Sequence, residues 1–346
     1  MNRFLLFLLS IFWCMAGISA NHPSSLLPLP QKYSFNGKNA NGKLTIEEKY
    51  VAQIQGAKFQ EEAYHLLITS KGILLEATTP KGMYWGKQTL EQLKYTKNKK
   101  IYLPQCDITD WPAFCIRGFM HDVGRSYIPV EELKREISLL SRYKINVFHW
   151  HLTENQAWRL ECKKYPQLNA PENMEREKGK FYTLDEARQL VEFCRQHQVL
   201  LIPEIDMPGH SAAFERTFKT GMQSEKGTQI LKDIIDEVCA TFDVPYLHIG
   251  TDEVQFTNPD FVPMMVKYIR DKGKKVISYN PGWNYKPGEI DMMQLWSYRG
   301  KAQKGIPAID CRFHYANHFD TYADLVAMFN SRIYNQTEGS DDLAAS

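Results

Sequence analysis

The 346-residue sequence lacks several features that would assign it to a broad class at once. Its formal net charge is only +2, with Lys and Arg dispersed among Asp and Glu, so it has neither a basic stripe for nucleic acid nor an acidic tail. None of its seven cysteines stands in a CxxC or similar metal-ligand spacing. After the first twenty residues no stretch is apolar and long enough to cross a bilayer. We therefore expect no nucleic acid partner, no cysteine-bound metal and no stable membrane insertion.

The first twenty residues, MNRFLLFLLSIFWCMAGISA, are typical of a cleaved export signal. Arg3 precedes an apolar stretch that begins at Phe4, and the segment ends in Ser19 and Ala20, which makes Asn21 the expected first mature residue. The alternative is a single membrane anchor, but the apolar stretch is short for a spanning helix. We expect an exported protein, whether periplasmic, displayed at the cell surface or secreted.

Six cysteines remain after the signal: Cys106, Cys115, Cys162, Cys194, Cys239 and Cys311. Most of them fall in apolar patterns and are interpreted as buried thiols. An exported protein can also form disulfides, and a Cys106–Cys115 bridge is the pairing left open.

The mature chain, about 326 residues, suits a barrel with an accessory module. Residues 21–110 hold short alternating runs and one stretch, MYWGKQTLEQLKYT, whose apolar positions recur at helical spacing. They predict a small α/β domain. The stretch DITDWPAF then supplies a proline-marked junction, and we assign residues 111–346 to the catalytic domain.

From residue 115 onward, short apolar strands alternate with amphipathic helices. Strands are expected at 115–123, 145–153, 199–206, 246–254, 275–280, 292–296 and 308–313, and helices at about 130–143, 183–197, 227–241, 259–272 and 319–330. Strands that alternate with helices form a parallel sheet, for which a TIM barrel of eight strands is the natural closure. Seven strands are readable, because the chain stops at EGSDDLAAS, where the eighth should begin.

Polar and aromatic side chains gather where these strands end, at the edge that carries the catalytic groups of TIM barrels. In chain order they are Asp122, Arg125, His149, His151, Glu154, Asn155, Glu204, Asp206, His210, Asp252, Glu253, Tyr279, Trp283, Trp296, His314, Tyr315, Asn317 and Asp320. Such convergence from separate segments is hard to explain as packing alone.

Each of these residues also has a purely structural interpretation. A lone Asp or Glu at a strand end often caps the next helix, and isolated tryptophans are more often core residues than ligand platforms. His248 is best interpreted as a core histidine, and Arg125 with Asp122 as an ion pair is an equal alternative to a substrate role. Asp252 and Glu253 are adjacent, so they can serve one site only if the chain leaves regular strand geometry there.

The His149-Trp-His151 pattern raises a metal site as a weaker hypothesis. It places two imidazoles on one face of a strand, and His210 and Asp252 could complete the ligands of a metal-dependent amidohydrolase. In those enzymes, however, the His-x-His pair follows the first barrel strand, and here it follows the second.

The ordered motifs resemble glycoside hydrolase family 20, the β-N-acetylhexosaminidases. The resembling stretches are 117–168, LIPEIDMPGH (201–210), HIGTDEV (248–254), PGW (281–283), QLW (294–296) and HYAN (314–317), with GMYWGKQTLEQL (82–93) in the preceding small domain. They cover nearly the whole mature chain in the family's order. The resemblance implies a TIM barrel that needs no cofactor or metal and takes a glycan with a terminal N-acetylhexosamine.

The resemblance also implies a mechanism. The enzyme would remove terminal β-linked GlcNAc or GalNAc with retention, through attack by the substrate's own 2-acetamido carbonyl. Glu253 would be the general acid and later the base, and Asp252 would orient the acetamido N–H and stabilise the positively charged intermediate. One carboxyl must keep a proton while its neighbour is ionised, which apolar walls around Glu253 would favour.

Further roles follow by position within the same motifs. Arg125 would grip sugar hydroxyls with its fork of donors. The remaining substrate contacts would come from Trp283 and Trp296, which would wall the acetamide pocket, from Tyr315, which would bond the acetamido carbonyl, and from Asn317. His210 and Glu154 would form the relay that positions the acid.

Three departures from the family bear on activity. The family commonly has Gly where this chain has Thr251, whose β-branched side chain restricts the turn. Glu154 and Asn155 stand where a pair of aspartates is more usual. The family's last strand, which brings a Trp and an acidic residue over the sugar, has no readable counterpart. An amino-sugar-binding pseudoenzyme, or an inactive fragment, is therefore the alternative to an active hydrolase.

Overall fold

The structure is a computed structural model that describes residues 26–40, 44–312 and 314–316, with positions 325, 326, 328, 330, 333 and 343–345. The expected signal, Asn317, Asp320 and most of the expected helix 319–330 lie outside the described residues. The chain divides into two compact units. One extends to Ala113 and takes in Arg142–Lys144, and the other holds the remainder from Phe114 onward.

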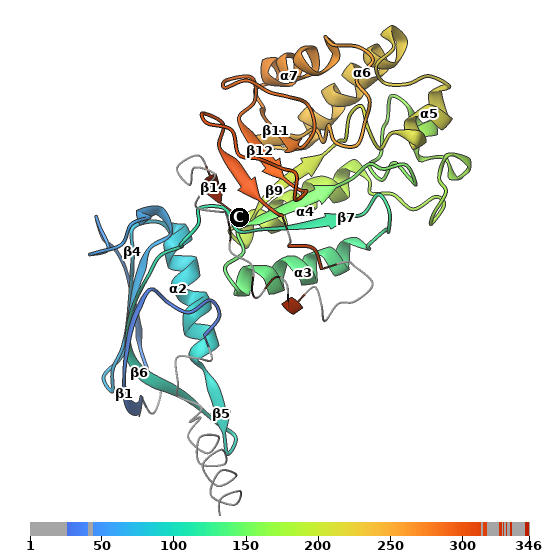
Figure 1. Ribbon diagram of the computed structural model, residues 1–346. Helices are drawn as coiled ribbons and strands as arrows, with labels where there is room; N and C mark the ends of the chain where they lie inside the picture. The colour runs from blue at the N-terminus through green and yellow to red at the C-terminus, as the bar shows by residue number, and fades with distance from the viewer. Residues whose placement is uncertain are drawn as a thin grey trace, which may run out of the picture. The chain divides into compact units, whose positions relative to one another are not determined.

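The first unit is a six-stranded sheet with one helix (Figure 1). Its elements are β1 (Lys32–Ala40), β2 (Ile46–Tyr50), β3 (Tyr64–Ile68), β4 (Ile73–Ala77), α2 (Pro80–Leu93), β5 (Tyr95–Lys97) and β6 (Lys100–Asp110). The strand order is β1-β6-β3-β4-β2, with β5 paired to β6. Only β2 and β4 pair in parallel; the other pairs are antiparallel.

Helix α2 covers the central strands of this sheet, and β3 and β4 alternate buried and half-buried residues as a result. The helix begins at Pro80, with Thr79 Oγ1 accepting a hydrogen bond from the Gly82 amide at 3.1 Å. A Cβ at Gly82 would overlap the Ala63 carbonyl oxygen, so glycine permits the close approach. The expected continuation of the helix to residue 96 is wrong, because Tyr95–Lys97 instead pairs with β6 as a hairpin.

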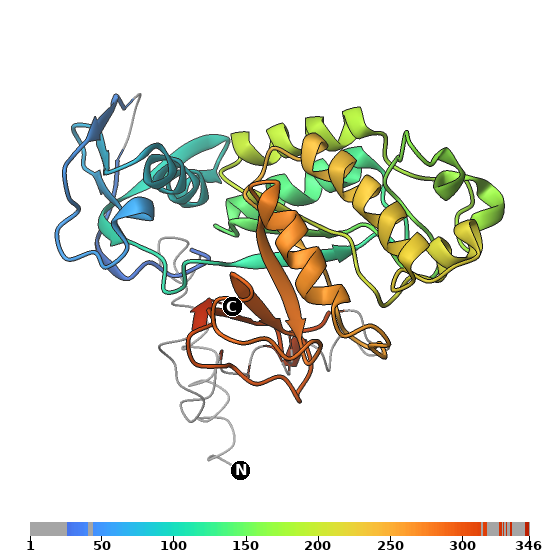
Figure 2. The ribbon, with the colours of Figure 1, turned by 90° about the horizontal axis from the view of Figure 1, so that it is seen from above.

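The second unit is an eight-stranded parallel sheet with helices around it (Figures 1 and 2). Its strands are β7 (Gly118–Asp122), β8 (Val147–His151), β9 (Leu200–Glu204), β10 (Tyr246–His248), β11 (Lys275–Asn280), β12 (Met292–Leu295), β13 (Ala308–Asp310) and β14 (Leu343–Ala345). Its helices are α3 (Val130–Arg142), α4 (Leu184–Gln196), α5 (Ala212–Phe218), α6 (Glu225–Thr241) and α7 (Phe261–Asp271), with 3-10 turns η3 (Pro166–Asn169) and η4 (Pro171–Asn173).

The strands follow one another in the sheet in chain order, from β7 at one edge to β14 at the other. All seven predicted strands are present, in a TIM-type arrangement. The expectation that no eighth strand exists is wrong, since Leu343–Ala345 pairs in parallel with β13. Three residues are too few for periodicity to show, which is why the sequence pattern missed them. Within the described residues β14 does not pair with β7, so the sheet is open between these edges.

Local signals explain where the helices begin. Thr183 and Glu186 form the predicted capping box of α4, with the Glu186 amide donating to Thr183 Oγ1 at 3.1 Å and the Thr183 amide donating to Glu186 Oε2 at 2.8 Å. Ser224 caps α6 by accepting from the Gly227 amide. Helix α5 was not predicted, because seven residues give little periodicity.

The interior of the sheet has two layers, which we call the lower and upper interior layers. The lower layer is Val147, Ile202, Ile277, Met292 and Ile309, from five different strands. Two residues further toward the carboxyl ends of the strands, the upper layer is His149, Glu204, His248, Tyr279 and Gln294, all buried. The opposite face of the strands packs on the helices, as Phe148 and Trp150 do in the main core. A parallel sheet covered on both faces has this pattern.

The cysteines are all free among the described residues, so the Cys106–Cys115 bridge does not form. Cys106, Cys162 and Cys194 are buried as predicted, whereas Cys115 is exposed. No helix in the described ranges is both long enough and apolar enough to pass through a membrane.

Candidate active site

The acidic pair lies in a sharp turn beyond β10. The strand was predicted to run to residue 254, but it ends at His248. Gly250, Thr251 and Glu253 then have φ values of +65°, +82° and +49°. Left-handed residues reverse the alternation of a strand, so the adjacent carboxylates of Asp252 and Glu253 are presented together at the carboxyl edge of the sheet.

This turn is strained at Thr251. Positive φ is uncommon outside glycine and is a genuine outlier for a β-branched residue, at a cost of about 1–3 kcal/mol. The Asp206 side chain supports the turn by accepting a hydrogen bond from the Thr251 amide at 3.2 Å. A side chain at Gly250 would overlap the same Asp206 carboxyl group, so only glycine fits there. The turn predicted from the resemblance therefore forms with Thr251 in place.

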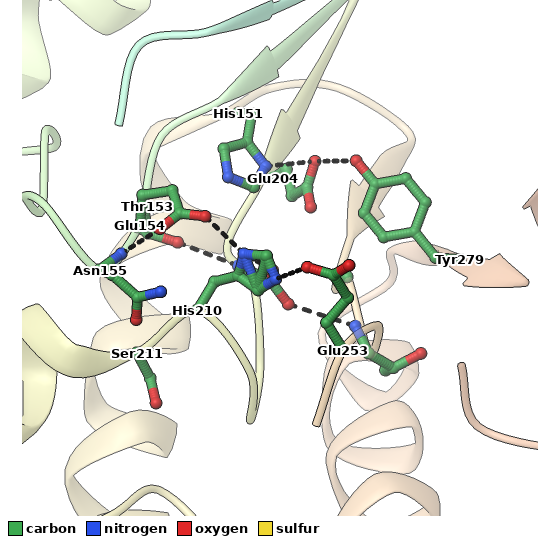
Figure 3. A network of polar contacts seen from close by, with 12 residues as sticks. His151, Thr153, Glu154, Asn155, Glu204, His210, Ser211, Glu253 and Tyr279 are labelled. Atoms are coloured by element: carbon green, nitrogen blue, oxygen red, sulfur yellow. Dashed lines mark hydrogen bonds and ion pairs between the residues drawn. The ribbon is translucent and has the colours of Figure 1, made fainter. Parts of the chain in front are cut away.

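A relay of side chains reaches Glu253, as Figure 3 shows. His210 Nε2 lies 3.3 Å from Glu253 Oε2, and its other ring nitrogen contacts Glu154 Oε1. Burial alone would lower the pKa of His210, but the hydrogen bond to Glu154 and the nearby Asp206 charge raise it to about 9. His210 is thus a cation at neutral pH, held between two carboxylates.

Arg125 joins the same relay from the loop after β7. One end of its guanidinium contacts Asp122, whose Oδ1 also accepts the Arg125 amide at 2.9 Å, and the other end contacts Glu154. Burial would raise the pKa of Glu154, but His210 and Arg125 together lower it. The Asp122–Arg125 ion pair does form, and Arg125 also stands beside the relay with its side chain 45% exposed.

Beneath the relay, Glu204 of the upper interior layer gathers basic and hydroxyl groups. His149 Nε2 and His151 Nδ1 lie 2.6 and 2.9 Å from Glu204 Oε2, and the Tyr279 hydroxyl donates to the same oxygen at 3.0 Å (Figure 3). Burial would raise the pKa of Glu204, yet the surrounding histidines hold it well below its usual range. Against the effect of burial, Glu204 in turn raises the pKa of His151 to about 10.

Asp206 and Asp252 lie next to this buried anion, and their pKa values are raised, whereas that of Glu204 is lowered. Burial, with the charges of Asp252 and Glu204, raises the pKa of Asp206 well above its usual range. Burial and Glu204 raise the pKa of Asp252 to about 6. Asp252 is therefore ionised at neutral pH, whereas the surroundings of Asp206 favour its protonated form. Asp252 Oδ1 is buried and has no hydrogen-bond partner among the described residues.

The two members of the pair differ in exposure, and one expectation is corrected. Apolar walls were expected around Glu253, but its side chain is 57% exposed, whereas Asp252 is only 8% exposed. The left-handed turn explains the difference, because it directs Asp252 toward the sheet interior and Glu253 toward the rim.

The aromatic residues predicted for substrate binding lie on neighbouring loops. Trp296 Nε1 donates to the Pro281 carbonyl at 2.8 Å, and the Tyr315 hydroxyl donates to the Trp296 carbonyl at 3.0 Å. The backbone N–H of Trp283 donates to Thr251 Oγ1 at 3.3 Å. Burial and then the charges of nearby groups, Asp252 and Glu253 among them, raise the pKa of Tyr315 to about 12, which places its hydroxyl near the acidic pair. Asn317 lies outside the described residues.

The metal site proposed from His149, His151, His210 and Asp252 is not assembled as one cluster. Potential ligand atoms instead form three groups within the described ranges: His149 with Glu204 and His248, His151 with Glu204 and Asp206, and Asp206 with His210 and Asp252. His149 Nε2 and His151 Nδ1 lie 2.6 and 2.9 Å from Glu204 Oε2, so contacts with this carboxylate already occupy these two ring nitrogens. The arrangement of His149 and His151 around Glu204 is that of ion pairs.

Several supporting residues were missed or left without a role by sequence reasoning. Thr153 Oγ1 accepts the Asp206 amide at 3.0 Å, the Ser278 hydroxyl donates to the Gly250 carbonyl in the turn, and the Tyr285 hydroxyl donates to Ser278. His248 is the fully buried histidine that was predicted, and its Nδ1 accepts the Gly250 amide at 3.1 Å. Ser278 sits within an apolar strand, and a polar residue in such a run was the available signal.

Two family models match the chain in succession. One, described as glycosyl hydrolase family 20, domain 2, matches residues 24–111, and the other, described as glycosyl hydrolase family 20, catalytic domain, matches residues 114–224. The catalytic match includes Arg125, Glu154 and His210.

Curated relatives carry related names. A "Beta-hexosaminidase" of Porphyromonas gingivalis is 34% identical over 259 residues, which is 65% of this chain and 33% of the relative. A "Beta-hexosaminidase" of Vibrio furnissii is 35% identical over 230 residues, which is 56% of this chain and 38% of the relative. The chain thus spans little more than a third of the length of either.

Solved structures share the fold. The chitobiase of Flavobacterium johnsoniae superposes with a TM-score of 0.78 at 23% identity, over 93% of this chain and 65% of that one. The N-acetyl-β-hexosaminidase of Streptomyces plicatus, solved with thio-NAglucal, gives a TM-score of 0.73 at 23% identity, over 83% of this chain and 74% of that one.

Proposed function

Because the chain belongs to glycoside hydrolase family 20, we propose that it is an exo-β-N-acetylhexosaminidase that removes terminal β-linked GlcNAc or GalNAc from glycoconjugates with retention. One observation carries the proposal. Among the described residues, one oxygen of the buried Asp252 carboxylate has no hydrogen-bond partner, and it lies directly beside a carboxyl group, Glu253, that a histidine relay holds at the rim. This is the pair of groups that substrate-assisted hydrolysis requires.

Asp252 is suited to the substrate's acetamido group. With a pKa raised to about 6 it is ionised at neutral pH, and its unpartnered oxygen can accept the acetamido N–H. That contact orients the acetamido carbonyl for attack on the anomeric carbon. The carboxylate also stabilises the positive charge that develops on the ring formed by this attack, and it does so best in the buried setting observed here.

Glu253 is suited to the proton transfers. Its exposed carboxyl group can reach the glycosidic oxygen and donate a proton as the bond to the leaving group breaks. The resulting carboxylate then takes a proton from the water that opens the intermediate. The ring of His210, held by Glu154 on its other side, lies 3.3 Å from Glu253 and fixes the position of its carboxyl group.

The remaining substrate contacts are proposed from position. Arg125, with its side chain 45% exposed beside the relay, would bind sugar hydroxyls, and Trp283, Trp296 and Tyr315 would surround the acetamide. Asn317 would contribute from the loop that follows. The substrate would be a glycan that ends in N-acetylhexosamine, and the leading segment supports export to a periplasmic, surface or extracellular location.

Release of chromophore from an aryl N-acetyl-β-glucosaminide tests the proposal. We expect Glu253→Gln to lower kcat/KM by about 100-fold or more, because glutamine cannot transfer the proton. The corresponding aryl β-glucoside, which lacks the acetamido nucleophile, should not be cleaved. Glu192→Gln, an exposed change on α4, is the matched control and should match the unaltered chain. Equal rates for the Glu253→Gln and unaltered proteins would contradict the assignment.

A second candidate is an amino-sugar-binding protein without turnover. The exposure of Glu253 favours it, since a general acid works best in a less hydrated setting. Calorimetric binding of an N-acetylglucosamine thiazoline with no hydrolysis of the aryl substrate would support this candidate over the enzyme.

A further inference from the structure

The side chain of Thr251 compensates the strained turn with a complete set of hydrogen bonds. Thr251 is fully buried at φ +82°, and its Oγ1 lies 2.7 Å from Ser278 Oγ and 3.3 Å from the Trp283 backbone nitrogen. Ser278 Oγ donates to the Gly250 carbonyl at 2.8 Å and accepts from the Tyr285 hydroxyl at 2.8 Å. Three segments meet at these two hydroxyls: the turn of Gly250 and Thr251, strand β11 with Ser278, and the loop of Trp283 and Tyr285.

The direction of every hydrogen bond can be assigned. A serine hydroxyl has one hydrogen and two acceptor positions, and the hydrogen of Ser278 is committed to the Gly250 carbonyl, which can only accept. Thr251 must therefore donate to Ser278, and its own oxygen then accepts the Trp283 N–H. Each hydroxyl uses its hydrogen once, so the chain of bonds is satisfied without water.

The loop of residues 281–285 is held by packing as well as by these bonds, since Trp283 meets Phe256 edge-on with ring centroids 4.8 Å apart and Tyr285 is buried in the main core. Trp283 and Tyr285 line a pocket of about 350 Å³ that they share with Val266 and Arg270 of α7. The loop also packs closely against Thr251, since a Cβ at Gly282 would come within 2.8 Å of Thr251 Oγ1. The Thr251 hydroxyl is thus the direct polar tie between the acidic turn and the backbone of Trp283.

We propose that Thr251 is a positioning residue whose hydroxyl joins the turn of Asp252 and Glu253 to the Trp283 loop, so that carboxylates and indole keep one relative placement. The inference rests on the proposed function, in which Trp283 walls the pocket of the attacking acetamide. Displacement of that wall misaligns the acetamido carbonyl, and alignment errors of about 1 Å lower rates steeply. The effect therefore falls on kcat more than on KM.

Three substitutions separate the hydroxyl from the backbone strain. Thr251→Val keeps the shape but loses the hydroxyl, and we expect kcat per folded enzyme to fall about tenfold with little change in KM. Thr251→Ser keeps the hydroxyl and should restore kcat toward that of the unaltered chain. Thr251→Gly relieves the left-handed strain, so its Tm should exceed that of Thr251→Val, yet its kcat should fall as well.

A measurement without substrate keeps the inference separate from the proposed function. Thr251→Val should change the tryptophan emission of the folded protein, and the same substitution in a Trp283→Phe background should not. Absence of hydrolysis by the unaltered chain would reject the enzyme but leave this emission difference as support for the tie. The inference is overturned if Thr251→Val matches the unaltered chain in emission, if Thr251→Ser is as impaired in kcat as Thr251→Val, or if Thr251→Gly retains full kcat.

Discussion

The two interior layers of the sheet use the same strands and have opposite chemistry. In the lower interior layer five aliphatic side chains fill the space, whereas two residues further along the strands the upper interior layer holds Glu204 with its histidines and Tyr279. Both layers are buried, so the difference is not one of exposure. The lower layer stabilises the sheet by removing apolar surface from water, and the upper layer fixes charges beneath the acidic turn.

This contrast explains why the pKa values of neighbouring buried carboxyl groups shift in opposite directions. Glu204 is an anion because histidines surround it, and its charge in turn favours the protonated form of Asp206. Asp252, one step nearer the rim, ionises at about pH 6. The interior thus changes toward the carboxyl ends of the strands, from aliphatic side chains through paired ions to Asp252 and Glu253.

The largest expected effect comes from breaking the upper layer with Glu204→Gln. The substitution leaves buried histidines without their anion, and we expect the free energy of unfolding to fall by about 3–5 kcal/mol in urea titrations. Ile277→Val in the lower layer is the matched control and should cost about 0.5–1.5 kcal/mol with kcat unchanged. Equal losses for the two variants would show that the upper layer contributes only packing.

The next effect comes from the relay above the layers. His210→Gln removes the cation between Glu154 and Glu253, and we expect kcat/KM to fall by about 100-fold as the acid loses its fixed position. His121→Gln is the control, since His121 also pairs with a carboxylate, Glu136, but has no contact with the relay. Comparable activity in the two variants would contradict the relay.

The smallest effect is a pH dependence that only the polar groups can produce. Burial raises the pKa of Asp252 to about 6, so the aspartate takes up a proton as the pH falls through 6, and at pH 5 we expect kcat/KM near a tenth of its plateau. His210, with a pKa raised to about 9, loses its proton as the pH rises through 9, and activity should decline there too.

Two variants test whether Asp252 causes the decline in activity below pH 6. Asp252→Asn cannot titrate at this position, so its residual activity should lack the decline below pH 6. Ile277→Val should leave the whole profile in place, because the lower layer contains no titratable group. If the decline below pH 6 persists in Asp252→Asn, another group causes it.

Much of the barrel could be predicted because its signals are local. Seven strands and the capping box at Thr183 follow from apolar runs and from a three-residue spacing. Helix α5, with seven residues, and strand β14, with three, were missed because so few residues carry little periodicity. The end of β10 was also placed too late, since an apolar run does not reveal where φ changes sign.

The candidate site divides in the same way. The residues Arg125, Glu154, His210, Asp252 and Glu253 could be named from motif order, and the structure brings them into one connected group. The burial and the neighbours of these side chains could not be predicted from the sequence. Glu253 was expected among apolar walls and is exposed, while Asp252 is the buried partner, because a turn with left-handed residues sends neighbours in directions that no strand pattern indicates.

The sequence by itself determined the family and the order of strands and helices, and it led to the prediction of the acidic pair, because each depends on residue type and spacing along the chain. Only the tertiary structure decided which carboxyl group of the pair is buried, in which direction the pKa values of Asp206 and Asp252 shift, and how Thr251 is accommodated. Those properties depend on distances between side chains from β9, β10 and β11, and the free energy of a buried charge is set by such neighbours.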